Sequence, residues 1–140
     1  MTVLTIIGLV VGVFILFFGA MKFNEFTQQE FRYIFFEMSS FIAIGISYAF
    51  LYFGNIWYES ALEKGEGTLN GIILMVIAVI VILAIIFRNF YETDFVTGLF
   101  GSLFQLLIYV LCTIVSAYVL IILFALALQA RPVYSINSRY

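Results

Sequence analysis

The chain has 140 residues, of which 65% are hydrophobic and 10% are charged, and its formal net charge at pH 7 is −2. Soluble globular domains are about half apolar and about a quarter charged, so this composition excludes a soluble fold. The few charges are mixed in sign, which also excludes the basic footprint of a nucleic-acid-binding protein.

Four apolar segments are each long enough to cross a membrane, and the mean hydropathy is +1.19. A hydrocarbon core about 30 Å thick requires about 20 apolar residues in a helix. The predicted helices cover residues 3–21, 28–57, 69–88 and 95–130, and a short polar tail follows at 131–140. The sequence therefore predicts a single, all-α integral membrane domain, a bundle of four transmembrane helices without a soluble domain.

Reactive side chains are scarce throughout the sequence. It contains no histidine and one cysteine, Cys112, which lies within the fourth segment. This excludes intramolecular disulfides, cysteine-ligated zinc and any haem or copper centre that this chain would hold through histidine. We therefore expect no metal, no cofactor and no enzymatic activity.

The first segment has no basic residue before it, so we expect a retained span rather than a signal peptide. Gly8, Gly12 and Gly19 lie on one side of this helix at about 100° per residue. The first two form a GxxxG spacing, which lets another backbone approach closely. We expect these glycines to pack the first helix against the rest of the bundle.

The end of the first segment carries a local resemblance. The run FFGAMKFNEF, from Phe17 to Phe26, resembles the end of the first helix in the DoxX-like family of four-helix bacterial membrane proteins. That family is associated with redox and oxidant-resistance functions. The likeness covers ten of the 140 residues, and no functional residue is carried over from it.

The second segment contains the one ionisable residue that lies among apolar neighbours, Glu37. Thr27 and Glu30 fit a capping box, which predicts that this helix begins near Gln28. Glu37 then lies just inside the apolar slab, where its carboxyl group must be protonated, paired or hydrated. Two interpretations stay open: a hydrogen bond to a neighbouring helix or to Arg32, and a proton, cation or substrate site.

Polar residues line one side of this second helix and one side of the fourth. The first stripe, within about 140° of arc, consists of Glu37, Ser40, Ser47, Tyr48, Tyr52 and Asn55. The second, within about 100°, consists of Ser102, Gln105, Tyr109, Cys112, Thr113 and Ser116. Since helices two and four run in the same direction, we expect the stripes to face each other.

The third helix is aliphatic all round after Gly71, without a polar or small face, which predicts a position at the periphery of the bundle or against a partner protein. The fourth helix, about 50 Å long at 1.5 Å per residue, exceeds an upright crossing, so it must tilt, protrude from the membrane or begin along the interface. Lysine and arginine are tied at three on each side, so charge does not predict the orientation.

Without a soluble domain or catalytic groups, the chain is predicted to be a non-enzymatic, membrane-embedded subunit of a larger homo- or hetero-oligomeric assembly. Its expected partners are the lipid bilayer and either itself or other membrane protein subunits, and its expected location is the cell membrane, plasma or inner. The alternative is a small oligomeric channel or transporter for an ion, proton or small solute, with the polar stripes lining the path.

Overall fold

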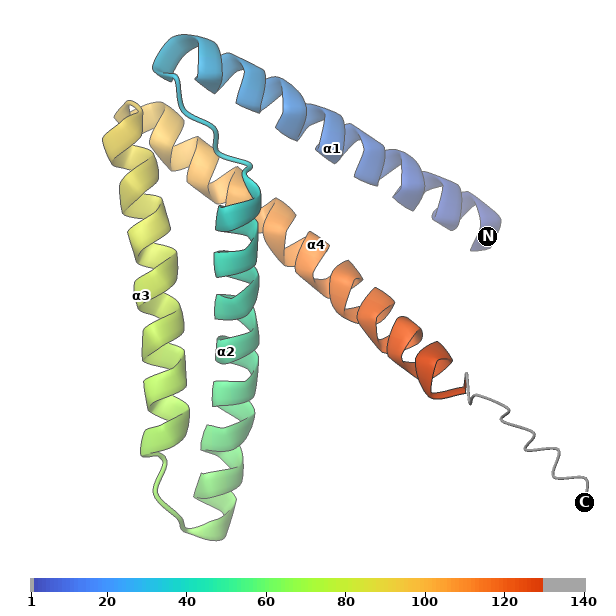
Figure 1. Cartoon of the computed structure of the whole chain (residues 1–140), viewed down its shortest axis with the longest axis vertical. Helices are drawn as coiled ribbons and strands as arrows, with labels where there is room; N and C mark the ends of the chain where they lie inside the picture. Colours follow the sequence, from blue (N-terminus) through green and yellow to red (C-terminus); the bar gives the residue numbers. More distant parts are fainter. Residues whose placement is uncertain (1, 130–140) are drawn as a thin grey trace, which may run out of the picture.

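The computed structural model describes residues 2–129, which form four α-helices and no strand (Figure 1). The helices are α1 (Thr2–Phe31), α2 (Met38–Lys64), α3 (Leu69–Glu92) and α4 (Phe95–Gln129). All four are long and apolar enough to cross a membrane, which confirms the predicted all-α, four-span fold class. The predicted tail at 131–140 lies outside the described residues.

The boundary between the first two helices differs from the prediction. α1 does not end after the apolar segment but continues to Phe31, and Arg32 then adopts a left-handed backbone with a φ of 55°. α2 begins at Met38 instead of near Gln28. The polar residues that were expected to form the first turn of the second helix instead belong to the last turn of α1.

The predicted capping box is wrong because its threonine lies inside α1. Thr27 is fully buried, and its hydroxyl donates to the Asn24 carbonyl at 3.2 Å. A threonine hydroxyl within a helix commonly bonds to a carbonyl of the preceding turn. The local sequence is therefore compatible with Thr27 at the start of a helix and with Thr27 inside one. The burial of Thr27 against its neighbours favours the continuous helix.

α2 and α3 form an antiparallel hairpin, which is the most extensive helix pair in the structure (Figure 1). Their backbones nearly touch where a Cβ on Gly71 would lie 2.7 Å from the Gly54 carbonyl oxygen. Ala78, which is completely buried, lies two turns further along the same side of α3. The prediction that α3 has no small-residue face is wrong, because these residues give it a close-packing face towards α2.

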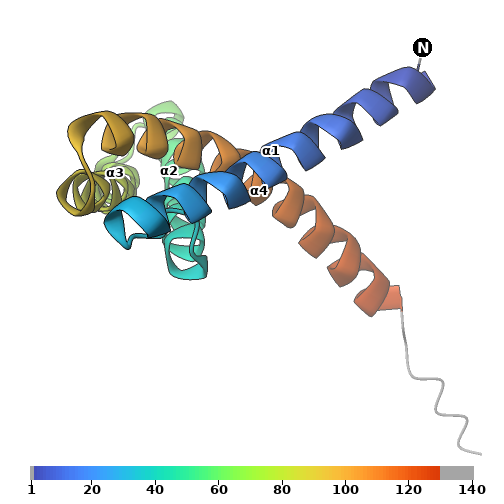
Figure 2. The same ribbon diagram turned by 90° about the horizontal axis from the view of Figure 1, so that it is seen from above.

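α1 and α4 leave the hairpin obliquely, and the two helices diverge from each other beyond their crossing (Figures 1 and 2). α4 has 35 residues, or about 52 Å at 1.5 Å per residue, and it runs at a slant to the α2–α3 hairpin (Figure 1). The end of α1, residues 32–37, the start of α2, the end of α3 and the first part of α4 meet at one end of the hairpin. We call this region the junction.

Candidate functional site

The centre of the junction is the short non-helical segment 32–37 between α1 and α2. Phe35 in this segment is completely buried, and its ring lies against Gly101 of α4, where a Cβ would collide with it. It also packs edge-on against Phe23 of α1, with ring centroids 5.1 Å apart. Non-helical backbone in an apolar setting requires a partner for each polar group, so the neighbouring helices must supply these.

α1 supplies the first set of partners through Asn24. The Asn24 Oδ1 accepts a hydrogen bond from the Phe36 amide at 2.9 Å, and its Nδ2 donates to the Phe36 carbonyl at 3.1 Å. One side-chain amide thus satisfies both backbone groups of a residue that has no helical partners. This pair of bonds fixes the end of α1 to segment 32–37.

α4 supplies the second set of partners from its polar stripe. The Gln105 amide donates to the Phe35 carbonyl, and the Tyr109 hydroxyl donates to the Glu37 carbonyl at 3.2 Å. Both side chains are buried. The structure therefore brings these two stripe residues together with the backbone beside Glu37, at the same end of the hairpin.

Asn89 of α3 connects this arrangement to a second layer of buried hydrogen bonds. The Tyr33 hydroxyl donates to Asn89 Oδ1 at 2.7 Å, while Asn89 Nδ2 donates to Ser102 at 2.9 Å and to Gln105 Oε1 at 2.8 Å. Burial raises the pKa of Tyr33 against the opposing effect of the nearby Arg88 charge. The phenol therefore stays protonated and acts as a donor.

Glu37 occupies the N-cap position of α2 and lies outside the helix proper. Its Oε1 accepts a hydrogen bond from Arg88 of α3 at 2.8 Å and another from the Ser40 hydroxyl at 3.1 Å. The cation beside it is thus Arg88, not Arg32. Burial acts to raise the pKa of Glu37, but hydrogen bonds from Ser39, Arg88 and Ser40 outweigh burial and hold the pKa below its ordinary value.

The middle of the first stripe also bonds within the chain. The Tyr48 hydroxyl donates to the Leu106 carbonyl of α4 at 3.0 Å. Ser47 is buried, and its hydroxyl donates to the Ala43 carbonyl of its own helix at 2.8 Å. The Tyr48 bond thus connects α2 to α4 where the two helices cross, while Ser47 bonds within α2.

Further from the junction the two stripes separate, because α4 crosses α2 obliquely (Figure 1). Tyr52 and Asn55 are exposed, and the Asn55 amide donates to Glu59 one turn along the same helix. Ser116 donates to a carbonyl of its own helix, while the buried Thr113 hydroxyl has no hydrogen-bond partner among residues 2–129. The expected face-to-face contact of the stripes is therefore limited to the half nearer the junction.

The glycines of α1 do not have the predicted packing role within the described chain. A Cβ on Gly8 or Gly12 would meet no atom within 4 Å. One on Gly19 would meet only the Phe104 ring, at 3.7 Å. The prediction is wrong for Gly8 and Gly12, because these residues lie in the N-terminal part of α1, which diverges from the other helices (Figures 1 and 2).

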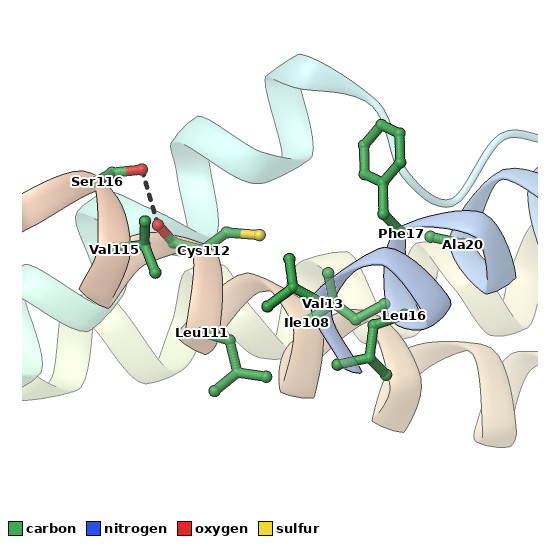
Figure 3. A pocket seen from close by; sticks show the side chains of 9 residues that line it. All are labelled: Val13, Leu16, Phe17, Ala20, Ile108, Leu111, Cys112, Val115 and Ser116. Carbon is green, nitrogen blue, oxygen red and sulfur yellow. Dashed lines mark hydrogen bonds between the residues drawn. The ribbon is translucent and has the colours of Figure 1, made fainter. Parts of the chain in front are cut away.

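Two apolar grooves lie where α4 diverges from its neighbours. The groove between α1 and α4 has a volume of about 260 Å³ and is lined by residues such as Val13, Leu16 and Cys112 (Figure 3). The groove between α2 and α4 is larger, about 790 Å³, and includes Tyr52 and Thr113. Among residues 2–129, no three His, Cys, Asp or Glu side chains gather where they would hold a metal ion.

Sequence reasoning missed Asn24, Tyr33, Arg88 and Asn89 as members of the junction. Asn24 and Asn89 were assigned to polar connections between helices, where such residues are common and need no internal partner. Tyr33 and Arg88 were assigned to the predicted second and third helices without a polar role. The available signal was two asparagines, each directly beyond an apolar run. At that position an amide lies at the edge of the membrane and can serve both a helix end and a buried neighbour.

No family model, curated protein or solved structure matches this chain. The resemblance of residues 17–26 to the DoxX-like family stays a local likeness, and in the structure these residues form the part of α1 that reaches the junction. The four apolar spans define the class of protein as a multi-pass membrane protein whose helices contact lipid.

Proposed function

We propose that this chain is a non-enzymatic, membrane-embedded subunit of a larger homo- or hetero-oligomeric assembly in the cell membrane, plasma or inner. The observation that carries the proposal is the divergence of α1 and α4 from the hairpin (Figures 1 and 2). Along α1 the first buried residue is Ala20, and along α4 the last is Tyr109. Long helical surfaces are thus left for lipid or for other membrane helices.

The glycines support a protein partner on α1. Where this chain brings two segments into close contact, glycine makes the approach possible, as at Gly54, Gly71 and Gly101. Gly8 and Gly12 have the spacing of such a contact but no neighbour within the described chain. Because lipid is as apolar as leucine, helices associate in a bilayer through this kind of close packing. We expect a helix of a second copy or of another subunit to lie there.

The contacts of the polar stripes support a structural role, in which the stripes hold the helices together, rather than the lining of an aqueous path. Near the junction, Gln105 and Tyr109 bond to the backbone of segment 32–37, and Glu37 is paired with Arg88. Buried polar groups that bond to one another hold helices together. In the proposed assembly Glu37 is therefore part of the connection between α2 and α3. Because the few charges are mixed in sign, we expect no nucleic-acid partner.

Proton and cation flux in proteoliposomes tests this proposal against the channel alternative. We expect wild type, Glu37→Gln and the control Glu63→Gln, a change at an exposed carboxylate near the α2–α3 turn, to be no more permeable than protein-free liposomes. A wild-type flux that disappears in Glu37→Gln and survives in Glu63→Gln would instead establish a channel or transporter with Glu37 in its path.

A further inference from the structure

Among residues 2–129, the buried residues of α1 all lie from Ala20 onward. Ala20 is the first buried residue of this helix, and Phe23 and Asn24 hold it to segment 32–37 through ring packing and the two hydrogen bonds to Phe36. The N-terminal part extends away from this attachment and diverges from α4 (Figures 1 and 2). One end of α1 is therefore packed on the junction, while the other end diverges from the helices of the hairpin and from α4 (Figures 1 and 2).

The space between α1 and α4 is apolar on both sides. Val13, Leu16 and Phe17 of α1 face Ile108 and Cys112 of α4 across the groove of about 260 Å³ (Figure 3). The only hydroxyl in its lining is already bonded to a carbonyl of α4. If the two helices came together, no polar group would lose a partner, and the facing side chains would fill the groove.

Gly19 stands directly before the first anchored residue of α1. A Cβ at this position would make one ordinary contact, 3.7 Å from the Phe104 ring, so an alanine would fit. Close packing therefore does not require glycine here, in contrast to Gly71 or Gly101, where a Cβ would collide with neighbouring atoms. Glycine does weaken a helix relative to alanine. Of the three glycines in α1, Gly19 is the one that lies at the boundary between the part packed on the junction and the part that diverges.

We propose that α1 is a hinged strap that bends at Gly19 and closes onto α4, filling the groove between them. Closure exchanges lipid contacts for helix contacts, and because these are similar in strength the open and closed arrangements lie close in free energy. The strap determines how much of α4 is accessible to lipid or to another subunit. This motion involves only α1 and α4 of one chain, so it does not depend on the proposed assembly.

A disulfide placed beyond the groove reports closure. Leu9 lies two turns before Leu16 on the same side of α1, and Val119 lies two turns after Cys112 on the same side of α4. A disulfide requires Cβ atoms about 3.5–4.5 Å apart. In full-length protein in liposomes, carrying Cys112→Ala, we expect Leu9→Cys and Val119→Cys to form an intramolecular disulfide on mild oxidation. The yield should be several-fold above that of a control pair with Val11→Cys, on the opposite side of α1.

Adding Gly19→Ala should lower that yield several-fold, because the hinge is stiffened without a steric clash. Equal oxidation of the Leu9→Cys and Val11→Cys pairs, absence of the intramolecular disulfide, or a yield unchanged by Gly19→Ala would each overturn the proposal. Spin labels at the same two cysteines, without oxidant, should show two distance populations that Gly19→Ala reduces to the longer one. A disulfide between copies migrates at twice the monomer mass, so failure of the strap is distinguishable from failure of the assembly.

Discussion

Replacing Asn89 by leucine is expected to lower the free energy of unfolding by about 2–4 kcal/mol. The substitution removes the acceptor of the Tyr33 hydroxyl and the donor to both Ser102 and Gln105, all of which are buried. A buried polar group left without a partner costs about 1–3 kcal/mol in soluble proteins, and interhelical hydrogen bonds in membrane proteins average about 0.6 kcal/mol. Three bonds at about 0.6 kcal/mol each give about 2 kcal/mol, and one buried group left without any partner adds about 2 kcal/mol more.

Equilibrium unfolding in detergent micelles or bicelles measures this effect against a matched asparagine. Asn55 is exposed on α2 and bonds only to Glu59 of the same helix. Asn55→Leu should therefore change stability by less than about 0.5 kcal/mol. Equal effects of Asn89→Leu and Asn55→Leu would show that the buried hydrogen bonds of the junction do not hold the helices together.

Gly71→Ala should destabilise the hairpin by about 1–3 kcal/mol, the usual range for overpacking a well-filled core. The added Cβ would lie 2.7 Å from both the Gly54 carbonyl oxygen and the Tyr58 amide nitrogen. Both are backbone atoms and cannot move aside as a flexible side chain would. The helices must therefore separate, which weakens the most extensive contact in the protein.

Gly12→Ala is the control for this substitution in monomeric, detergent-solubilised protein. No atom lies within 4 Å of the added Cβ, so the gain in helix propensity, up to about 1 kcal/mol, should leave stability unchanged or higher. Thermal unfolding of both variants under the same conditions compares them directly. If Gly71→Ala is as harmless as Gly12→Ala, the close approach of α2 and α3 at Gly54 is contradicted.

The four spans were predictable because the thickness of the bilayer alone sets the length of apolar sequence that a crossing helix needs. The excess length of α4 over an upright crossing followed from the sequence for the same reason. The contact of the two polar stripes near the junction followed from chain direction, since alternate crossings run the same way. These inferences need only the sequence and the dimensions of the membrane.

Features that depend on the neighbouring segment were not predictable from one sequence. Thr27 fits a helix start and a helix interior equally well, and only the burial around it decides. Gly71 and Ala78 become a packing face only where a second backbone, at Gly54, comes close enough to use them. The partner of Glu37 was likewise hidden, because Arg88 lies 51 positions away in the sequence.

The mass of the particle extracted from native membranes in lipid nanodiscs tests the proposed assembly most directly. We expect more protein than one 15.9 kDa chain, either a second copy or another membrane protein at a fixed ratio. Substituting Gly8→Ile and Gly12→Ile, which blocks close approach on α1, should shift the particle towards a single chain while the helix content is retained. A wild-type particle that holds one 15.9 kDa chain and no other protein would contradict the assembly.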